Sequence, residues 1–99
     1  MTLRHVVLFQ WNRDVPADHA DAVSAALAEL PGVIPEIRSY QFGPDAGLVP
    51  GNGDYAVVAD FDDAAGYFTY RQHPAHQKFI DDHITGKVAG RMAVQFDLT

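Results

Sequence analysis

Cysteine is absent from this chain of 99 residues. A chain without thiols forms no disulfide, and it has neither a thiolate nucleophile nor a thiolate metal ligand. This absence is typical of proteins in a reducing compartment. We therefore expect a cytoplasmic location.

Basic residues are scarce as well, because 7 Lys and Arg face 13 Asp and Glu, which gives a net charge of −6. The basic residues are scattered and form no cationic stripe of the kind that binds nucleic acid. No apolar run approaches the roughly 20 residues that span a bilayer. The apolar segment Leu3–Trp11 is too short for a signal peptide and is followed at once by charged residues. We expect neither nucleic acid nor a membrane as a partner.

What the chain does contain is ordinary for a globular domain: 47% hydrophobic and 20% charged residues. The length matches a common domain size, so we expect one domain over residues 1–99.

Hydrophobic periodicity and turn residues predict four strands and two helical regions. A proline divides the second helical region in two. The predicted order is β-α-β-β-α-β, that of an α+β, ferredoxin-like fold with a four-stranded antiparallel sheet. The strands are expected at Leu3–Trp11, Ile37–Gly43, Tyr55–Phe61 and Val88–Leu98, and the helices at Pro16–Leu30, from Asp62 or Asp63 to about Gln72, and from Pro74 to about Thr85.

The first and third strands are apolar on both faces. In the first strand, His5, Val7 and Phe9 share one face, while Val6 and Leu8 share the other. Such strands belong to a sheet that is covered on both sides. Two helical regions cover only one side, and a bare apolar face would be a large exposed patch. We therefore predict a homodimer whose two sheets pack face to face.

A tyrosine and two histidines stand within seven residues in the segment Tyr70–His76. Proline favours the first position of a helix, and the residue before it is pushed toward extended geometry. His73 and Pro74 should therefore form a structural corner, with Tyr70 closing one helix and His76 in the first turn of the next. His76 is a candidate general base and Tyr70 a candidate hydrogen-bond donor to a developing oxyanion. The alternatives are a histidine that packs the corner and an aromatic that belongs to the core.

The sequence resembles the stress-responsive dimeric α/β barrel (Dabb) family from Arg4 to Phe96. The likeness rests on Arg4–Phe9, Leu30–Arg38, Tyr55–Phe61 and, most specifically, the Tyr70…His73-Pro-Ala-His76 corner. It implies a ferredoxin-like dimer with a central barrel, and hence a stress-response A/B barrel domain. The best understood activity of that family is cofactor-free polyketide cyclisation of the olivetolic acid cyclase type.

By residue match, the resemblance makes Tyr70 and His76 catalytic and places His5 in the pocket. Val7 and Phe9 share the strand face of His5, so we expect them to bind substrate in a pocket between the two sheets. Some relatives hold a cation on main-chain carbonyls of a turn that Pro31, Ile34 and Ile37 match. Carbonyls leave no side-chain signature, and the histidines lack a metal-binding spacing, so we predict neither metal nor cofactor.

Three functions remain open. The first is an acid–base catalyst, a polyketide cyclase-like lyase or aldol-type enzyme, acting on a small apolar carbonyl compound. The second is a non-catalytic dimer that is stress-associated or binds a small apolar ligand. The third is a cofactor-free monooxygenase or isomerase, which only analogy of fold suggests.

Overall fold

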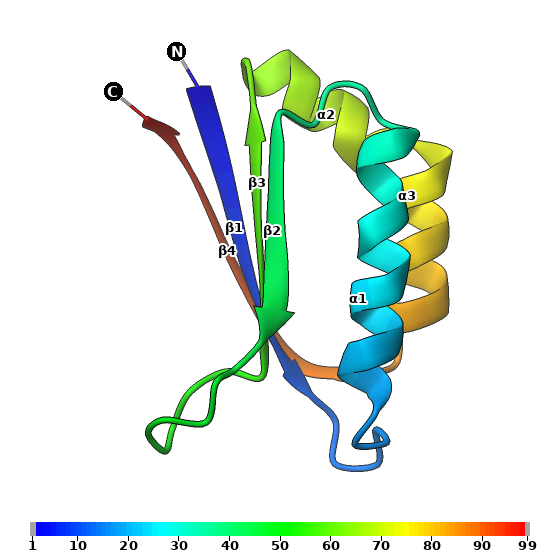
Figure 1. Ribbon diagram of the computed structural model, residues 1–99, viewed down its shortest axis with the longest axis vertical. Helices are drawn as coiled ribbons and strands as arrows, with labels where there is room; N and C mark the ends of the chain where they lie inside the picture. The colour runs from blue at the N-terminus through cyan, green and yellow to red at the C-terminus, as the bar shows by residue number, and fades with distance from the viewer. Residues whose placement is uncertain (1, 99) are drawn as a thin grey trace.

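The computed structural model describes residues 2–98 and contains one antiparallel sheet of four strands in the order β2-β3-β1-β4. The strands are β1 (Thr2–Trp11), β2 (Ser39–Pro44), β3 (Tyr55–Phe61) and β4 (Val88–Leu98). All helices lie on one side of this sheet (Figure 1). The predicted β-α-β-β-α-β, ferredoxin-like arrangement is therefore confirmed.

The first helix, α1 (His19–Glu29), packs against the sheet through a buried apolar stripe. Val23 and Leu27 lie on this stripe at helical spacing, and Leu30 continues it in the 3-10 turn Leu30–Gly32. Proline at position 31 lacks an N–H, which favours the end of the α-helix here. The helix begins three residues later than the sequence predicts.

The second helical region is divided as expected into α2 (Ala64–Gln72) and α3 (Pro74–Phe79). At the start of α2, the carboxylate of Asp63 accepts a hydrogen bond from the Gly66 N–H at 2.9 Å. Between the helices, His73 has φ −62° and ψ 135°, the extended geometry that a following proline imposes. The His73 Nδ1 atom accepts a hydrogen bond from the Ala75 N–H at 3.0 Å and so caps α3.

A π-helical turn, Ile80–Ile84, follows α3 and leads the chain back to the sheet. The Thr85 N–H donates to the carbonyl of Ile80 at 2.9 Å, which closes this wider turn. Gly86 then adopts φ 77°, a left-handed conformation that glycine adopts without a steric penalty.

The core lies between the sheet and the helices. On the sheet it consists of alternate residues of β1 and β3, which the antiparallel register places side by side. Full burial of one such large apolar side chain contributes about 1.5–3 kcal/mol, so this layer fixes the helices on the sheet. The residues of these two strands that belong to the core are His5, Val7, Phe9, Tyr55, Val57, Ala59 and Phe61.

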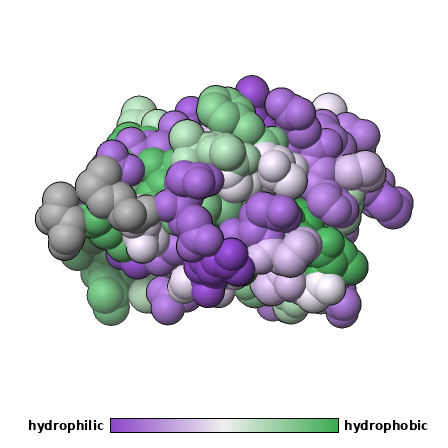
Figure 2. All heavy atoms as spheres, turned by 90° about the horizontal axis from the view of Figure 1, so that it is seen from above, coloured by the Kyte–Doolittle hydropathy of each residue, from purple (hydrophilic) through white to green (hydrophobic). Residues whose placement is uncertain are grey.

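Among residues 2–98, no helix covers the opposite face of the sheet, which is largely apolar apart from the Arg4–Asp60 ion pair. Its β4 residues Met92, Val94 and Phe96 are 70%, 57% and 45% exposed, and Leu8 of β1 is 43% exposed. Figure 2, a view from above Figure 1, shows green hydrophobic atoms on the left, the side of the sheet away from the helices. Strands that are apolar on both faces were thus predicted correctly.

The predicted position of the pocket between two sheets is wrong for this chain. The side chains of His5, Val7 and Phe9 point toward the helices, and Val6 and Leu8 lie on the helix-free face. Strand alternation assigns these residues to two different faces of the sheet. It does not show which of the two faces the helices cover.

Within residues 2–98, no helix combines the length and the hydropathy required to cross a bilayer.

Candidate functional site

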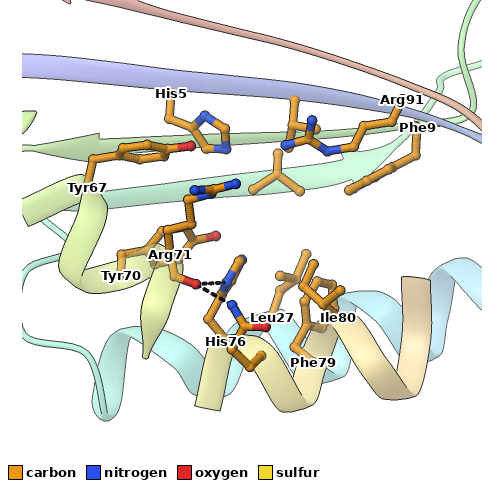
Figure 3. A pocket seen from close by; sticks show the side chains of 13 residues that line it. His5, Phe9, Leu27, Tyr67, Tyr70, Arg71, His76, Phe79, Ile80 and Arg91 are labelled. Carbon is orange, nitrogen blue, oxygen red and sulfur yellow. Dashed lines mark hydrogen bonds between the residues drawn. The ribbon is translucent and has the colours of Figure 1, made fainter. Parts of the chain in front are cut away.

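A cavity of about 250 Å³ lies between the sheet and the helical layer (Figure 3). The volume falls just below the roughly 300–1,000 Å³ of pockets for drug-sized molecules, so it suits a small ligand. Most of its wall is apolar, and the polar groups come from both sides. The lining residues are His5, Val7, Phe9, Leu27, Val57, Tyr67, Tyr70, Arg71, His76, Gln77, Phe79, Ile80 and Arg91.

The corner at His73 brings Tyr70 and His76 together, although six positions separate them. Tyr70 lies in the last turn of α2 and His76 in the first turn of α3. The centroids of their two rings are 4.3 Å apart. The corner at His73-Pro74 thus places a phenol beside an imidazole in the wall of the cavity.

The hydrogen bonds of His76 define which ring nitrogen carries the proton. Its Nδ1 lies 3.2 Å from the carbonyl oxygen of Arg71, which also accepts from the Gln77 side-chain amide at 2.7 Å. A carbonyl only accepts, so Nδ1 carries the hydrogen, and Nε2 of the neutral ring keeps a lone pair. Burial lowers the pKa of His76 from its ordinary value of 6.5, the hydrogen bond to the Arg71 carbonyl opposes this shift, and the charges of Arg71 and Arg91 add to it. At neutral pH the ring is therefore an uncharged proton acceptor.

His5 faces the corner from β1 and has the opposite tautomer. The Gln95 side-chain amide donates a hydrogen bond to His5 Nδ1 at 2.8 Å. The proton of the neutral ring therefore lies on Nε2, which makes this atom a donor. Burial lowers the pKa of His5 to about 4, with the charges of Arg91 and His76 acting in the same direction. His5 is 4% exposed and packs against Tyr67, with ring centroids 5.0 Å apart.

Tyr70 is both a core residue and a wall of the cavity. It is 3% exposed and packs against Phe61, with ring centroids 5.1 Å apart. Its hydroxyl oxygen lies 2.7 Å from that of Tyr40 on β2. Burial raises the pKa of Tyr70 to about 12, against a lowering effect of the hydrogen bond with Tyr40. The phenol is therefore protonated at neutral pH and able to donate.

The other predicted site residues take different places. Val7 and Phe9 lie in the apolar wall of the cavity. His73 and Pro74 form the corner and do not line the cavity. In the part of the chain that the structure describes, no three His, Asp or Glu side chains gather in a way that would hold a metal ion.

Sequence reasoning missed several polar residues around this site, among them Tyr40, Tyr67, Arg71 and Arg91. Arg91 had a usable signal, because it is a charged residue in the apolar strand predicted at Val88–Leu98. Arg71 directly follows Tyr70 and could have been noticed for that reason. Tyr40 had no signal, because its contact with Tyr70 joins residues that are 30 positions apart.

The fold and the site together define a ferredoxin-like α/β domain with a small, partly polar cavity between its layers. The family model described as Stress responsive A/B Barrel Domain matches residues 3–98, and the chain belongs to this family. The family predicted from the corner is therefore confirmed.

Two similar proteins have no described activity. One is a dimeric ferredoxin-like protein of unknown function from Thermobifida fusca, whose sequence is 46% identical to this chain. Its crystal structure matches with a TM-score of 0.91, over 99% of this chain and 92% of that chain. An uncharacterized protein of Streptomyces coelicolor is 32% identical over 77 residues, which are 76% of this chain and 79% of that protein.

A third similar protein is an enzyme. The hydroxynitrile lyase from Passiflora edulis has a TM-score of 0.84 at 16% identity, over 99% of this chain and 94% of that chain. At this level of identity the likeness concerns the fold alone.

Proposed function

We propose that the protein is an acid–base catalyst of the polyketide cyclase or aldol type, acting on a small apolar carbonyl compound. The observation that carries this proposal is the complementary protonation of the groups around one cavity. His76 offers a lone pair on Nε2, while His5 offers an N–H and Tyr70 an O–H. A proton acceptor opposite two donors is what the formation of an enolate requires.

In the first step, His76 Nε2 takes a proton from the carbon between two carbonyl groups of the substrate. The electron pair of that C–H bond moves to a carbonyl oxygen and forms an enolate. Tyr70 and His5 donate hydrogen bonds to this oxygen as its charge develops. A positioned general base contributes about 10²–10⁴-fold, and loss of one oxyanion donor costs about 10²–10³-fold.

In the second step, the enolate carbon attacks another carbonyl of the same molecule and forms a carbon–carbon bond. The new alkoxide takes up the proton that His76 holds, so the closure conserves protons and electrons without a further reactant. The apolar wall of Val7, Phe9 and Val57 would favour a folded chain that brings the two carbons together.

We propose further that the protein is a homodimer that covers the helix-free face of the sheet. The exposed Leu8, Met92, Val94 and Phe96 on that face support this proposal. So does the dimeric state of the Thermobifida fusca protein, which is 46% identical.

Proton abstraction is testable without knowledge of the natural substrate. The probe is benzoylacetone, a neutral compound with an acidic carbon between two carbonyls, and the measurement is deuterium uptake at that carbon in D₂O by NMR. We expect the protein to accelerate uptake and His76→Ala to abolish most of the acceleration. Tyr70→Phe and His5→Gln should each reduce it. His83→Ala is the matched control, because His83 does not line the cavity.

Two results would contradict the catalytic proposal. One is a wild-type protein that binds benzoylacetone without accelerating deuterium uptake, which would favour the non-catalytic ligand-binding alternative. The other is a His76→Ala variant that remains as active as His83→Ala.

A further inference from the structure

Two arginines at the cavity have no protein partner in the part of the chain that the structure describes. Three other basic side chains pair with carboxylates: Arg4 with Asp60, Arg38 with Asp62 and Lys78 with Asp82. Arg71 and Arg91 line the cavity, and within residues 2–98 their guanidinium groups form neither an ion pair nor a hydrogen bond. In a chain with 13 acidic residues, two unpaired arginines at one small cavity require an explanation.

The two arginines reach the cavity from opposite layers. Arg91 lies on β4 opposite Phe9 of β1, so its side chain is on the helix-covered face. Arg71 follows Tyr70 at the end of α2. Figure 3 shows the guanidinium of Arg71 between His5 and His76, and that of Arg91 above the cavity beside Phe9. Both residues are exposed, so they stand at the mouth rather than in the core.

The charge of Arg91 acts on the buried groups of the site. It contributes to the lowered pKa of His5 and of His76. It also acts to lower the pKa of Tyr70, against the raising effect of burial. The charge of Arg71 acts on His76 as well, so neither arginine is remote from the acid–base groups.

We propose that the carbonyl compound that binds this cavity is a small oxo acid, with an apolar body and a carboxylate that Arg71 and Arg91 bind. The inference rests on the proposed function, because it places the ketone of the same molecule at Tyr70, His5 and His76. Guanidinium groups present paired donors that match a carboxylate, and they bind it by charge-assisted hydrogen bonds. Two cations at the mouth of a cavity in an acidic protein also concentrate anions there.

Binding of the carboxylate has a second consequence for His76. The positive charges of Arg71 and Arg91 disfavour protonation of its ring. A bound carboxylate offsets these charges and raises the pKa of His76, which makes its Nε2 a stronger base. The substrate therefore activates the group that removes its own proton.

The test compares benzoylpropionate, a stable oxo acid, with benzoylpropionamide, its neutral counterpart of the same shape. Calorimetry at low ionic strength measures the affinity of each compound for the wild type, Arg91→Gln and Arg71→Gln. We expect the wild type to prefer the carboxylate by about tenfold, which corresponds to about 1.4 kcal/mol. Each variant should lose most of that preference while it keeps its affinity for the amide. Arg13→Gln is the charge-matched control, because Arg13 is exposed and outside the cavity.

A second readout follows the His76 ring proton by NMR during a pH titration. Benzoylpropionate should raise the midpoint of the titration in the wild type, and benzoylpropionamide should not. Equal affinity of the wild type for both compounds would overturn the inference, as would Arg71→Gln and Arg91→Gln variants that keep the full preference.

Failure of this inference can be distinguished from failure of the proposed function. Benzoylacetone carries no carboxylate, so its deuterium uptake tests His76 independently of the arginines. A carboxylate preference without proton abstraction would leave the binding inference standing and remove the catalytic one. Proton abstraction without a carboxylate preference would leave the catalytic proposal standing and remove the binding inference.

Discussion

The hydroxyl oxygen of Tyr40 lies 2.7 Å from that of Tyr70 and connects strand β2 to the last turn of α2. Burial raises the pKa of Tyr40, and the hydrogen bond raises it further, whereas the same bond lowers the pKa of Tyr70. Either hydroxyl can donate in this bond, and when Tyr40 donates, the Tyr70 hydrogen is available for a ligand. In the proposed mechanism, Tyr40 is a positioning residue for Tyr70.

Tyr40→Phe should weaken both stability and proton abstraction. The change leaves the buried Tyr70 hydroxyl without its partner, so we expect the free energy of unfolding to fall by about 1 kcal/mol. Urea unfolding measures this loss, and deuterium uptake by benzoylacetone should also slow. The control is the same change in a Tyr70→Phe background, where it should slow uptake no further. An equal slowing in both backgrounds would contradict the positioning role.

The rate of proton abstraction should fall in acid as His76 becomes protonated. Only the neutral ring accepts a proton, and the pKa of His76 is lowered from 6.5. The rate should therefore be level near pH 7 and reach half its value at a pH below 6.5. A pH series of deuterium uptake, corrected for the uncatalysed reaction, measures this midpoint. A midpoint above 6.5 would show that another group limits the rate.

His5 should make the folded protein less stable in acid. Its pKa is about 4 in the folded state and close to 6.5 in an unfolded chain. Between these values the unfolded state binds more protons, so the free energy of unfolding falls as the pH drops through this window. Below the lower value both states are protonated, and this contribution becomes constant.

The comparison with His5→Gln isolates this contribution, because the carboxylates titrate alike in both proteins. Urea unfolding at neutral and acidic pH should show a smaller acid loss for His5→Gln than for the wild type. Parallel losses in the two proteins would show that His5 titrates normally.

A charge on the helix-free face should separate the proposed dimer. Val94 is 57% exposed on this face, and Val94→Asp should give a folded monomer in sedimentation experiments. Leu48→Asp is the matched control, because Leu48 is 84% exposed in the loop between β2 and β3. It should remain as dimeric as the wild type. A Val94→Asp variant that stays dimeric would place the interface elsewhere.

The local signals in the sequence were sufficient to predict most of the fold. Proline at position 74 predicted the break between α2 and α3, and the structure has it at His73. Asp63 was one of the two positions at which α2 was expected to begin, and its carboxylate caps that helix. Such features depend on residues a few positions apart, whose interactions follow from backbone geometry.

The site was harder to predict because it depends on contacts between distant segments. The alternation in β1 showed that His5, Val7 and Phe9 share one face of the sheet. It did not show that the helices cover this face. The pair of Tyr40 and Tyr70 depends on the packing of β2 against α2, which no spacing along the chain shows. Arg91 stands out in the sequence as a charge in an apolar strand, but its place at the cavity follows only from the register of β4 on β1.

Adjacent residues of β1 point to opposite faces of the sheet. Val7 faces the cavity, and Val6 faces the side that the proposed dimer would cover. The same is true of Val57 and Val58 in β3, which pair with Val7 and Val6 in the register of the sheet. Under the two proposals, ligand binding and self-association depend on alternate residues of the same two central strands. Single substitutions along β1 should therefore impair ligand binding and dimer formation at alternate positions.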